Sequence, residues 1–153
     1  PYHYIHCYLN IPDTSGRDSL FQAEARRCKD ILDTITNSDK NDRHFCIFDE
    51  LFSGTNPYEA ISSAYSYLEF LSKFKNVEFM LTTHFITLCK RINNNKRIEN
   101  CFMKTKQIEN TIVYQYKLQK GISDIKGGIT VLENLGYPLE IINMTKQIIQ
   151  TLH

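Results

Sequence analysis

His44-Phe45-Cys46-Ile47-Phe48-Asp49-Glu50 is a continuous apolar run that ends abruptly in two acids. An unbroken apolar run of this length is typical of a strand that is buried on both faces of a parallel sheet. Ligands of such sheets bind beyond the carboxyl ends of the strands. The run therefore predicts a central parallel strand that places Asp49 and Glu50 at the ligand-binding edge of the sheet.

Strands and helices alternate on both sides of this run. Strands are expected at residues 3–9, 44–48, 77–83, 98–104 and 111–118, the last two as an antiparallel pair. Helices are expected at residues 19–36, 57–72, 85–92, 129–135 and 138–152. In the first helix the apolar face is expected to consist of Phe21, Ala25, Cys28, Leu32 and Ile35. The order of strands and helices predicts an α/β fold with a mostly parallel sheet flanked by helices.

The composition excludes several classes of protein. With 153 residues, 42% of them hydrophobic and 23% charged, the chain has the composition of an ordinary globular domain and not of a disordered tail or a fibre. The formal net charge of +1 supplies no electrostatic reason for this chain to bind nucleic acid or a membrane. No apolar run approaches the ~18–20 residues of a membrane-spanning helix. Pro1 leads directly into a strand without a signal sequence, so we expect a piece of a longer intracellular protein.

The five cysteines favour free thiols over a metal or redox site. They are far apart in the sequence and contain no Cys-x-x-Cys pair. We expect reduced and mostly buried thiols. His3 and His6 are expected on opposite faces of the first strand, so they would not chelate a metal together.

The acid pair Asp49-Glu50 is the strongest chemical signal. A hard cation and a phosphate chain above the sheet would explain it: Asp49 would hold Mg²⁺ through water, and Glu50 would orient and deprotonate an attacking water. Two solvated acids at a strand end are also common, and the pair alone does not separate these interpretations. Gly54-Thr55 before a helix, and His84 at the end of the next strand, favour the phosphate site.

Taken in order, these motifs resemble a known family. The chain is similar to the C-terminal part of the ATPase domain of MutS-like DNA mismatch-repair proteins, which belong to the ABC ATPase superfamily. His44–Glu50 resembles the Walker B strand, and Leu81-Thr82-Thr83-His84-Phe85 resembles the switch-histidine strand. Gly16–Glu24 resembles the signature loop and helix start, and Gly128–Ile142 resembles the C-terminal helical dimerisation segment.

The resemblance implies a fold, two ligands and partners. The fold would be that of an ABC-type P-loop NTPase without its N-terminal portion, with residues 1–125 in the ATPase domain and 126–153 in a helical dimerisation segment. ATP and Mg²⁺ would be the cofactors. The protein would form a homodimer, or a heterodimer with a paralogue, and would bind mismatched or structured double-stranded DNA through upstream domains, without any membrane.

The resemblance also implies roles for single residues. Glu50 would be the general base, Asp49 the magnesium residue and His84 the γ-phosphate sensor. Ser19, at the start of the first helix, would contact the γ-phosphate held by the partner subunit. The remaining nucleotide contacts implied are Gly16, Gly54 and Thr55.

The sequence departs from the family pattern in places. One residue is inserted around Asp18, and Leu20 stands where threonine is common. An extra acid so near a phosphate is unfavourable, which leaves the alignment of Arg17 and Asp18 open. These differences indicate a divergent branch, and the abundance of Asn, Ile and Lys is typical of an AT-rich genome such as that of some viruses.

A phosphate-binding P-loop requires Gly-x-x-x-x-Gly-Lys-Ser/Thr, and none of the six glycines is followed by lysine. In the family this loop lies upstream, on a strand beside Walker B, so we expect the chain to bind ATP weakly or not at all. An alternative is a dimerisation or scaffold module, derived from an ATPase, that has lost hydrolysis. An ATPase of the double-strand-break or cohesin type is disfavoured because the Leu-Ser-Gly-Gly signature is absent.

Overall fold

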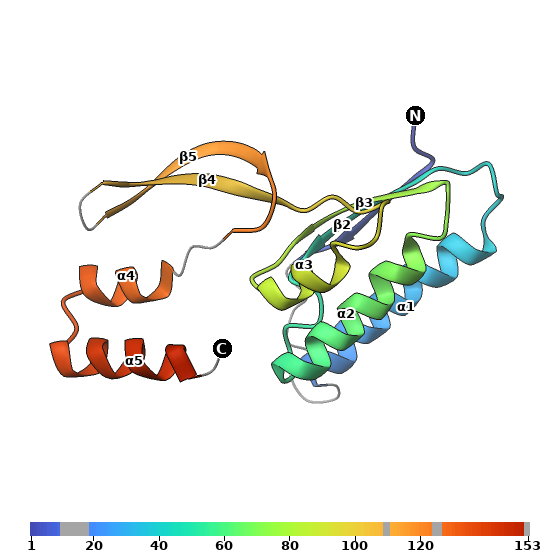
Figure 1. Ribbon diagram of the computed structural model, residues 1–153. Coiled ribbons are helices and arrows are strands. Elements are labelled where there is room, and N and C mark those ends of the chain that lie inside the picture. The colour runs from blue at the N-terminus through green and yellow to red at the C-terminus, as the bar shows by residue number, and fades with distance from the viewer. Residues whose placement is uncertain (10–18, 109–110, 124–126, 152–153) are drawn as a thin grey trace. The chain divides into compact units, whose positions relative to one another are not determined.

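The computed structural model describes residues 1–9, 19–108, 111–123 and 127–151 (Figure 1). The chain forms two compact units, residues 1–98 and 99–153. Within the described residues, no helix is long and apolar enough to cross a membrane.

The first unit is built on a three-stranded parallel sheet. Its strands are β1 (Tyr4–Tyr8), β2 (His44–Asp49) and β3 (Val77–Thr82), in the order β1-β2-β3. The mostly parallel sheet expected from the sequence is therefore confirmed. Both edges of β2 are already paired, by β1 and by β3. A further strand could therefore pair only at the outer edge of β1 or of β3, and the upstream P-loop strand stays a prediction.

Three helices connect and cover these strands: α1 (Leu20–Asn37), α2 (Pro57–Leu71) and α3 (Ile86–Ile92). Local sequence sets where the first two begin. Ser19 and Gln22 form a capping box at the start of α1. Asn56 caps α2 by accepting hydrogen bonds from two backbone N–H groups, and Pro57 occupies its first turn.

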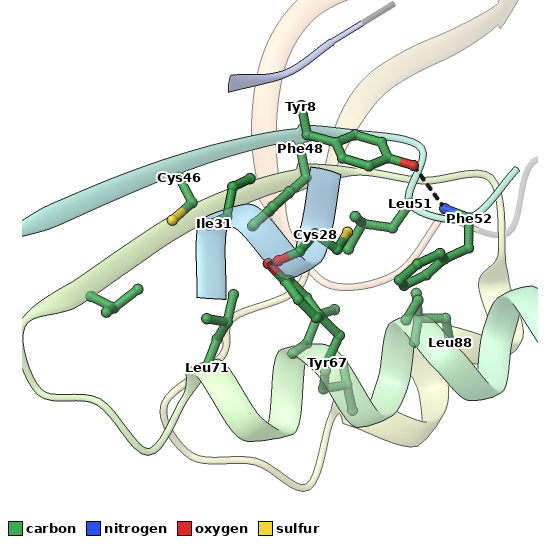
Figure 2. Packing of buried hydrophobic residues seen from close by; sticks show 14 of the residues in the cluster. Tyr8, Cys28, Ile31, Cys46, Phe48, Leu51, Phe52, Tyr67, Leu71 and Leu88 are labelled. Atoms are coloured by element: carbon green, nitrogen blue, oxygen red, sulfur yellow. Dashed lines mark hydrogen bonds between the residues drawn. The ribbon is translucent and has the colours of Figure 1, made fainter. Parts of the chain in front are cut away.

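The core lies between the sheet and these helices. Along β1 and β2 the side chains alternate, so that Tyr8, Cys46 and Phe48 are buried. The ring of Phe48 meets the ring of Tyr67 edge to face, with centroids 5.7 Å apart, and the Tyr67 hydroxyl donates to the Cys28 carbonyl (Figure 2). The opposite sheet face leaves Ile5 and Met80 more than half exposed, so within this unit the helices protect one face only.

The buried face of α1 differs from the one expected. Cys28 and Ile35 are buried as predicted, whereas Phe21, Ala25 and Leu32 are only partly buried. Glu24 and Ile31 are fully buried in addition. Glu24 is buried because loop residues after β2 cover the first turns of α1 and bond to its carboxylate.

The second unit contains the antiparallel strands β4 (Cys101–Ile108) and β5 (Thr111–Lys120), followed by α4 (Gly127–Asn134) and α5 (Leu139–Thr151). The antiparallel pair is confirmed, but β4 begins three residues later than expected because Ile98 N–H closes a turn on Asn95. The register shifts between Met103 and Thr105, and Tyr116, which lies between their partners Leu118 and Tyr114 on β5, has a φ of 53°. Such a left-handed residue is typical of a β-bulge.

The border between the compact units lies after Ile98. The sequence placed a border after residue 125, which together with residue 126 lies outside the described residues. β4 and β5 contact each other, and β5 also contacts α4, so the strand pair groups with the C-terminal helices, and the predicted border between an ATPase domain and a dimerisation segment stays a prediction.

All five cysteines are free. Cys28 and Cys46 are buried, and burial raises the pKa of each thiol to about 12, so both stay protonated. Cys89 is half-buried, and Cys7 and Cys101 are exposed. The expectation of mostly buried thiols is therefore wrong, because Cys7 lies on the sheet face away from the helices and Cys101 starts an exposed strand.

Candidate functional site

The acid pair lies at the carboxyl end of the central strand. Asp49 is the last residue of β2 and faces Thr82, the last residue of β3. The Thr82 hydroxyl donates a hydrogen bond to Asp49 Oδ1, and Glu50 N–H donates to the Thr82 carbonyl oxygen at 3.0 Å. The ends of β2 and β3 are thus fixed to each other at the point where both acids emerge.

His84 lies at the same edge of the sheet. Its Nε2 is 2.8 Å from Glu50 Oε1, and its side chain is 89% exposed, against 44% for Glu50. The sequence expectation that the acids and His84 converge is met in the structure. An imidazole and a carboxylate in contact, both open to solvent, are able to share a proton or to hold a water between them and a ligand.

The backbone turns sharply after β2. Glu50 has a φ of 53° and Phe52 a φ of 60°. Both values lie in the left-handed region of backbone conformation, which residues other than glycine rarely adopt. Residues of this kind cost about 1–3 kcal/mol each and persist where the surrounding structure holds them. Here the buried side chains of Leu51 and Phe52 anchor the turn, which directs Glu50 outward to the edge of the sheet.

Ser19 begins α1, the helix that precedes β2. Its Oγ accepts a hydrogen bond from Gln22 N–H at 3.3 Å, and its own N–H donates to the Gln22 side chain. The hydroxyl proton of Ser19 is not used in this capping box. The helix N-terminus carries a partial positive charge, so a negative group is favoured beside it. Gly16, the other residue predicted there, lies outside the described residues.

Gly54 and Thr55 have hydrogen-bond partners within the chain. Gly54 N–H donates to Glu24 Oε2 at 3.0 Å, and the Thr55 hydroxyl donates to Glu59 Oε2 at 2.6 Å. A Cβ at Gly54 would come within 2.8 Å of Phe21 N. Packing therefore explains the glycine, and the predicted contacts of these two residues with a nucleotide stay predictions.

The donor set suits a magnesium ion that keeps most of its waters. Asp49 Oδ1 is engaged by Thr82, which leaves Oδ2 available on an exposed carboxylate. Among the described residues there is no group of three His, Cys, Asp or Glu side chains able to hold a metal ion alone. Mg²⁺ is commonly bound by one or two carboxylates together with water and phosphate oxygens, and Asp49 fits that pattern.

Sequence reasoning missed two buried polar clusters. Glu24 is only 2% exposed and bonds to the loop after β2. At the other end of the sheet, His6 Nε2 lies 3.0 Å from His44 Nδ1, and Ser38 Oγ lies 2.8 Å from His44 Nε2. The sequence did not predict a contact between His6 and His44. His44, at the start of β2, lies far from Asp49 along the strand, so this pair is not part of the candidate site.

Comparison with known proteins gives the family. The chain matches the family model of MutS domain V over residues 3–153. The chain belongs to the MutS domain V family. It is 30% identical over 142 residues to the DNA mismatch repair protein MutS of Clostridium perfringens, which covers 92% of this chain and 15% of that protein. It is 29% identical over 137 residues to the DNA mismatch repair protein MutS of Bacteroides fragilis, covering 88% of this chain and 15% of that protein.

A third relative has similar coverage. The DNA mismatch repair protein MutS of Prochlorococcus marinus is 30% identical over 142 residues, which is 93% of this chain and 15% of that protein. The domain V chain described here therefore spans about 15% of the length of these relatives.

Proposed function

We propose that this chain is the C-terminal part of an ABC-type ATPase domain in a MutS-like protein acting in DNA mismatch repair. The parent would couple ATP binding and hydrolysis to clamping of a dimer on mismatched or structured DNA. The observation that carries the proposal is the convergence of Asp49, Glu50 and His84 at one edge of a parallel sheet, in a chain of the domain V family. DNA contacts would come from upstream domains, because the chain itself is nearly neutral.

Glu50 is the proposed general base. Its carboxylate emerges at the sheet edge, where a water placed for attack on a terminal phosphate would be within reach. His84 contacts the same carboxylate and would donate a hydrogen bond to the γ-phosphate. The left-handed turn at Glu50 supports this role because it directs the side chain away from the core.

Asp49 would hold Mg²⁺ through the oxygen that Thr82 does not engage. The ion, when bound, would neutralise charge on the phosphate oxygens. Ser19 would act on a nucleotide held by a second subunit: its hydroxyl proton and the N-terminus of α1 together favour an anion. Gly54 and Thr55 belong to the same proposed nucleotide environment, together with Gly16.

Self-association is the proposed role of α4 and α5. These helices expose large apolar side chains, namely Val131, Leu135, Leu139, Ile141, Met144 and Ile148. Exposed apolar groups of this number commonly mark a protein–protein contact. A homodimer, or a heterodimer with a paralogue, would bury them.

A scaffold without hydrolysis is the second candidate. What supports it is the set of exposed apolar side chains on α4 and α5, which would serve association whether or not the parent hydrolyses ATP. The same exposed helices would then carry its only activity, which is association.

Glu50→Gln in the full-length parent separates the two candidates. We expect ATP binding to be retained and turnover to fall by about 100-fold or more, since an amide cannot accept the proton of the attacking water. Equilibrium nucleotide binding and steady-state hydrolysis are the measurements. Glu69→Gln is the matched control. Glu69 lies near the C-terminal end of α2, and its carboxylate accepts a hydrogen bond from the Asn95 side chain. Unchanged turnover in Glu50→Gln, or no turnover in the unmodified parent, would reject the ATPase assignment.

A further inference from the structure

The carboxylate of Glu24 is buried and has no part in the proposed chemistry. It lies on the second turn of α1, and its side chain bonds to the loop that follows β2. Oε1 accepts from the Ser53 hydroxyl at 2.9 Å, and Oε2 accepts from Gly54 N–H at 3.0 Å. A carboxylate withdrawn from water is costly unless its oxygens are hydrogen-bonded. Both of its oxygens are bonded here, and both bonds hold one short loop.

The same loop is packed against the start of α1. A Cβ placed on Gly54 would come 2.7 Å from Leu20 Cγ and 2.8 Å from Phe21 N, so the loop backbone touches the first turn of the helix. The rings of Phe21 and Phe52 also lie together, with centroids 5.9 Å apart. Loop and helix start therefore form one packed body.

The first strand joins this body through Tyr8. Phe52 N–H donates to the Tyr8 hydroxyl at 3.3 Å (Figure 2). Burial raises the pKa of Tyr8; the Phe52 hydrogen bond opposes this rise, and the neighbouring Glu24 charge adds to it. The hydroxyl consequently stays protonated. β1, α1 and the loop after β2 thus meet in one buried polar cluster.

Glu50 begins the loop that this cluster holds. Because Glu50 and Phe52 both have left-handed backbone conformations, the direction of the Glu50 side chain depends on contacts that keep the loop in that shape. Ser53 and Gly54 follow within four residues, and Glu24 holds both.

We infer that Glu24 is a positioning residue for Glu50: its carboxylate holds the loop after β2 in the shape that presents Glu50 at the sheet edge, and ties that loop to the helix whose first turn carries Ser19. The inference rests on the proposed ATPase function. It makes the placement of the general base depend on α1, so a displacement of α1 by a nucleotide at its N-terminus would reach Glu50 directly.

Three variants of the full-length parent test this. Glu24→Ala removes both hydrogen bonds to the loop. Glu24→Gln keeps them, because the amide oxygen accepts from Gly54 N–H and the amide N–H₂ donates to the Ser53 oxygen. Glu69→Ala is the control. It removes a half-buried carboxylate that accepts a hydrogen bond from Asn95, which lies outside the loop after β2.

Two measurements are made on each folded variant: steady-state kcat and KM for ATP, and hydrogen–deuterium exchange of amides 50–56 without nucleotide. We expect Glu24→Ala to lower kcat by about 10- to 100-fold with KM within about threefold, as for a misplaced catalytic group. Exchange of the loop amides should be faster. Glu24→Gln and Glu69→Ala should stay within about threefold of the unmodified kcat, with unchanged loop exchange.

Unchanged kcat and unchanged loop exchange in Glu24→Ala would overturn the inference. A decrease in kcat in Glu24→Gln equal to that in Glu24→Ala would overturn it as well. If Glu24→Ala does not fold, Ser53→Ala takes its place: it removes the Oε1 bond alone, and the same two measurements decide. Absence of turnover in the unmodified parent rejects the proposed function separately, and the exchange of amides 50–56 then still decides whether Glu24 holds the loop.

Discussion

The two compact units bury their apolar side chains to very different extents. In the first, the sheet and three helices enclose a core that contains sixteen of the seventeen buried hydrophobic residues found among the described residues. In the second, Ile142 is the one such residue. Leu71 of α2 is 0% exposed, whereas Leu139 of α5 is 75% exposed.

The difference distinguishes apolar residues that stabilise the fold of their own unit from apolar residues that are left exposed on its surface. A domain is stabilised when helices and sheets bury their apolar faces against each other, as α1 and α2 do here. The apolar stripe of α5 is not buried within its own unit beyond Ile142. A stripe of that kind gains stability only by contact with a further surface, such as a second copy of the chain.

Matched leucine truncations give the largest expected effect. Leu71→Ala should lower the free energy of unfolding by about 3–5 kcal/mol, because it removes buried methyl groups and leaves a cavity. Leu139→Ala should change it by less than about 0.5 kcal/mol, since its side chain is already in water. Chemical denaturation of each variant measures both values. Equal losses would show that the two units do not differ in the way their burial indicates.

The next largest expected effect is a pH dependence of the free energy of unfolding, which arises from the buried pair His6 and His44 in the first unit. The pKa of His6 is lowered by burial first, then by His44 and by Arg27. The pKa of His44 is lowered by burial, with Asp42 opposing and His3 assisting. The unfolded chain therefore binds protons at a higher pH than the native chain does. As pH falls below about 6.5, the free energy of unfolding should decrease, by at most about 1.4 kcal/mol per pH unit for each histidine.

Denaturation curves between pH 8 and pH 5 check this expectation, with His6→Gln as the comparison. The variant keeps a polar side chain but cannot take up a proton, so its free energy of unfolding should vary less with pH. Equal pH dependence in both proteins would show that His6 does not contribute to the pH dependence of unfolding.

The site at the sheet edge was predictable because parallel strands bring their carboxyl ends together. That rule alone places Asp49 beside the strand that leads to His84, and the structure agrees. The helix starts at Ser19 and near Pro57 were predictable from local capping chemistry.

Glu24 and the histidine pair were not predictable by the same means. A charged residue in a helix is ordinarily expected on the solvent side. Burial of Glu24 is favourable because its carboxylate accepts hydrogen bonds from Gly54 N–H and from the Ser53 hydroxyl, about thirty residues away in the sequence. The contact of His6 with His44 depends on the pairing of β1 with β2 across 38 residues. The border between the units likewise follows from contacts of β5 with α4.

The smallest expected change in stability comes from the exposed stripe of α5. Ile141, Met144 and Ile148 lie on one face of the helix and are 46–54% exposed. Replacing Ile141 and Ile148 together by serine should alter the free energy of unfolding by no more than about 0.5 kcal/mol per site. Self-association, measured by sedimentation over a range of concentrations, should weaken by at least about tenfold, which corresponds to about 1.4 kcal/mol. Asn143→Ser on the same helix is the control and should leave both quantities unchanged. If instead the serine variant loses stability while association persists, the stripe packs inside its own chain and the comparison between the two units no longer holds.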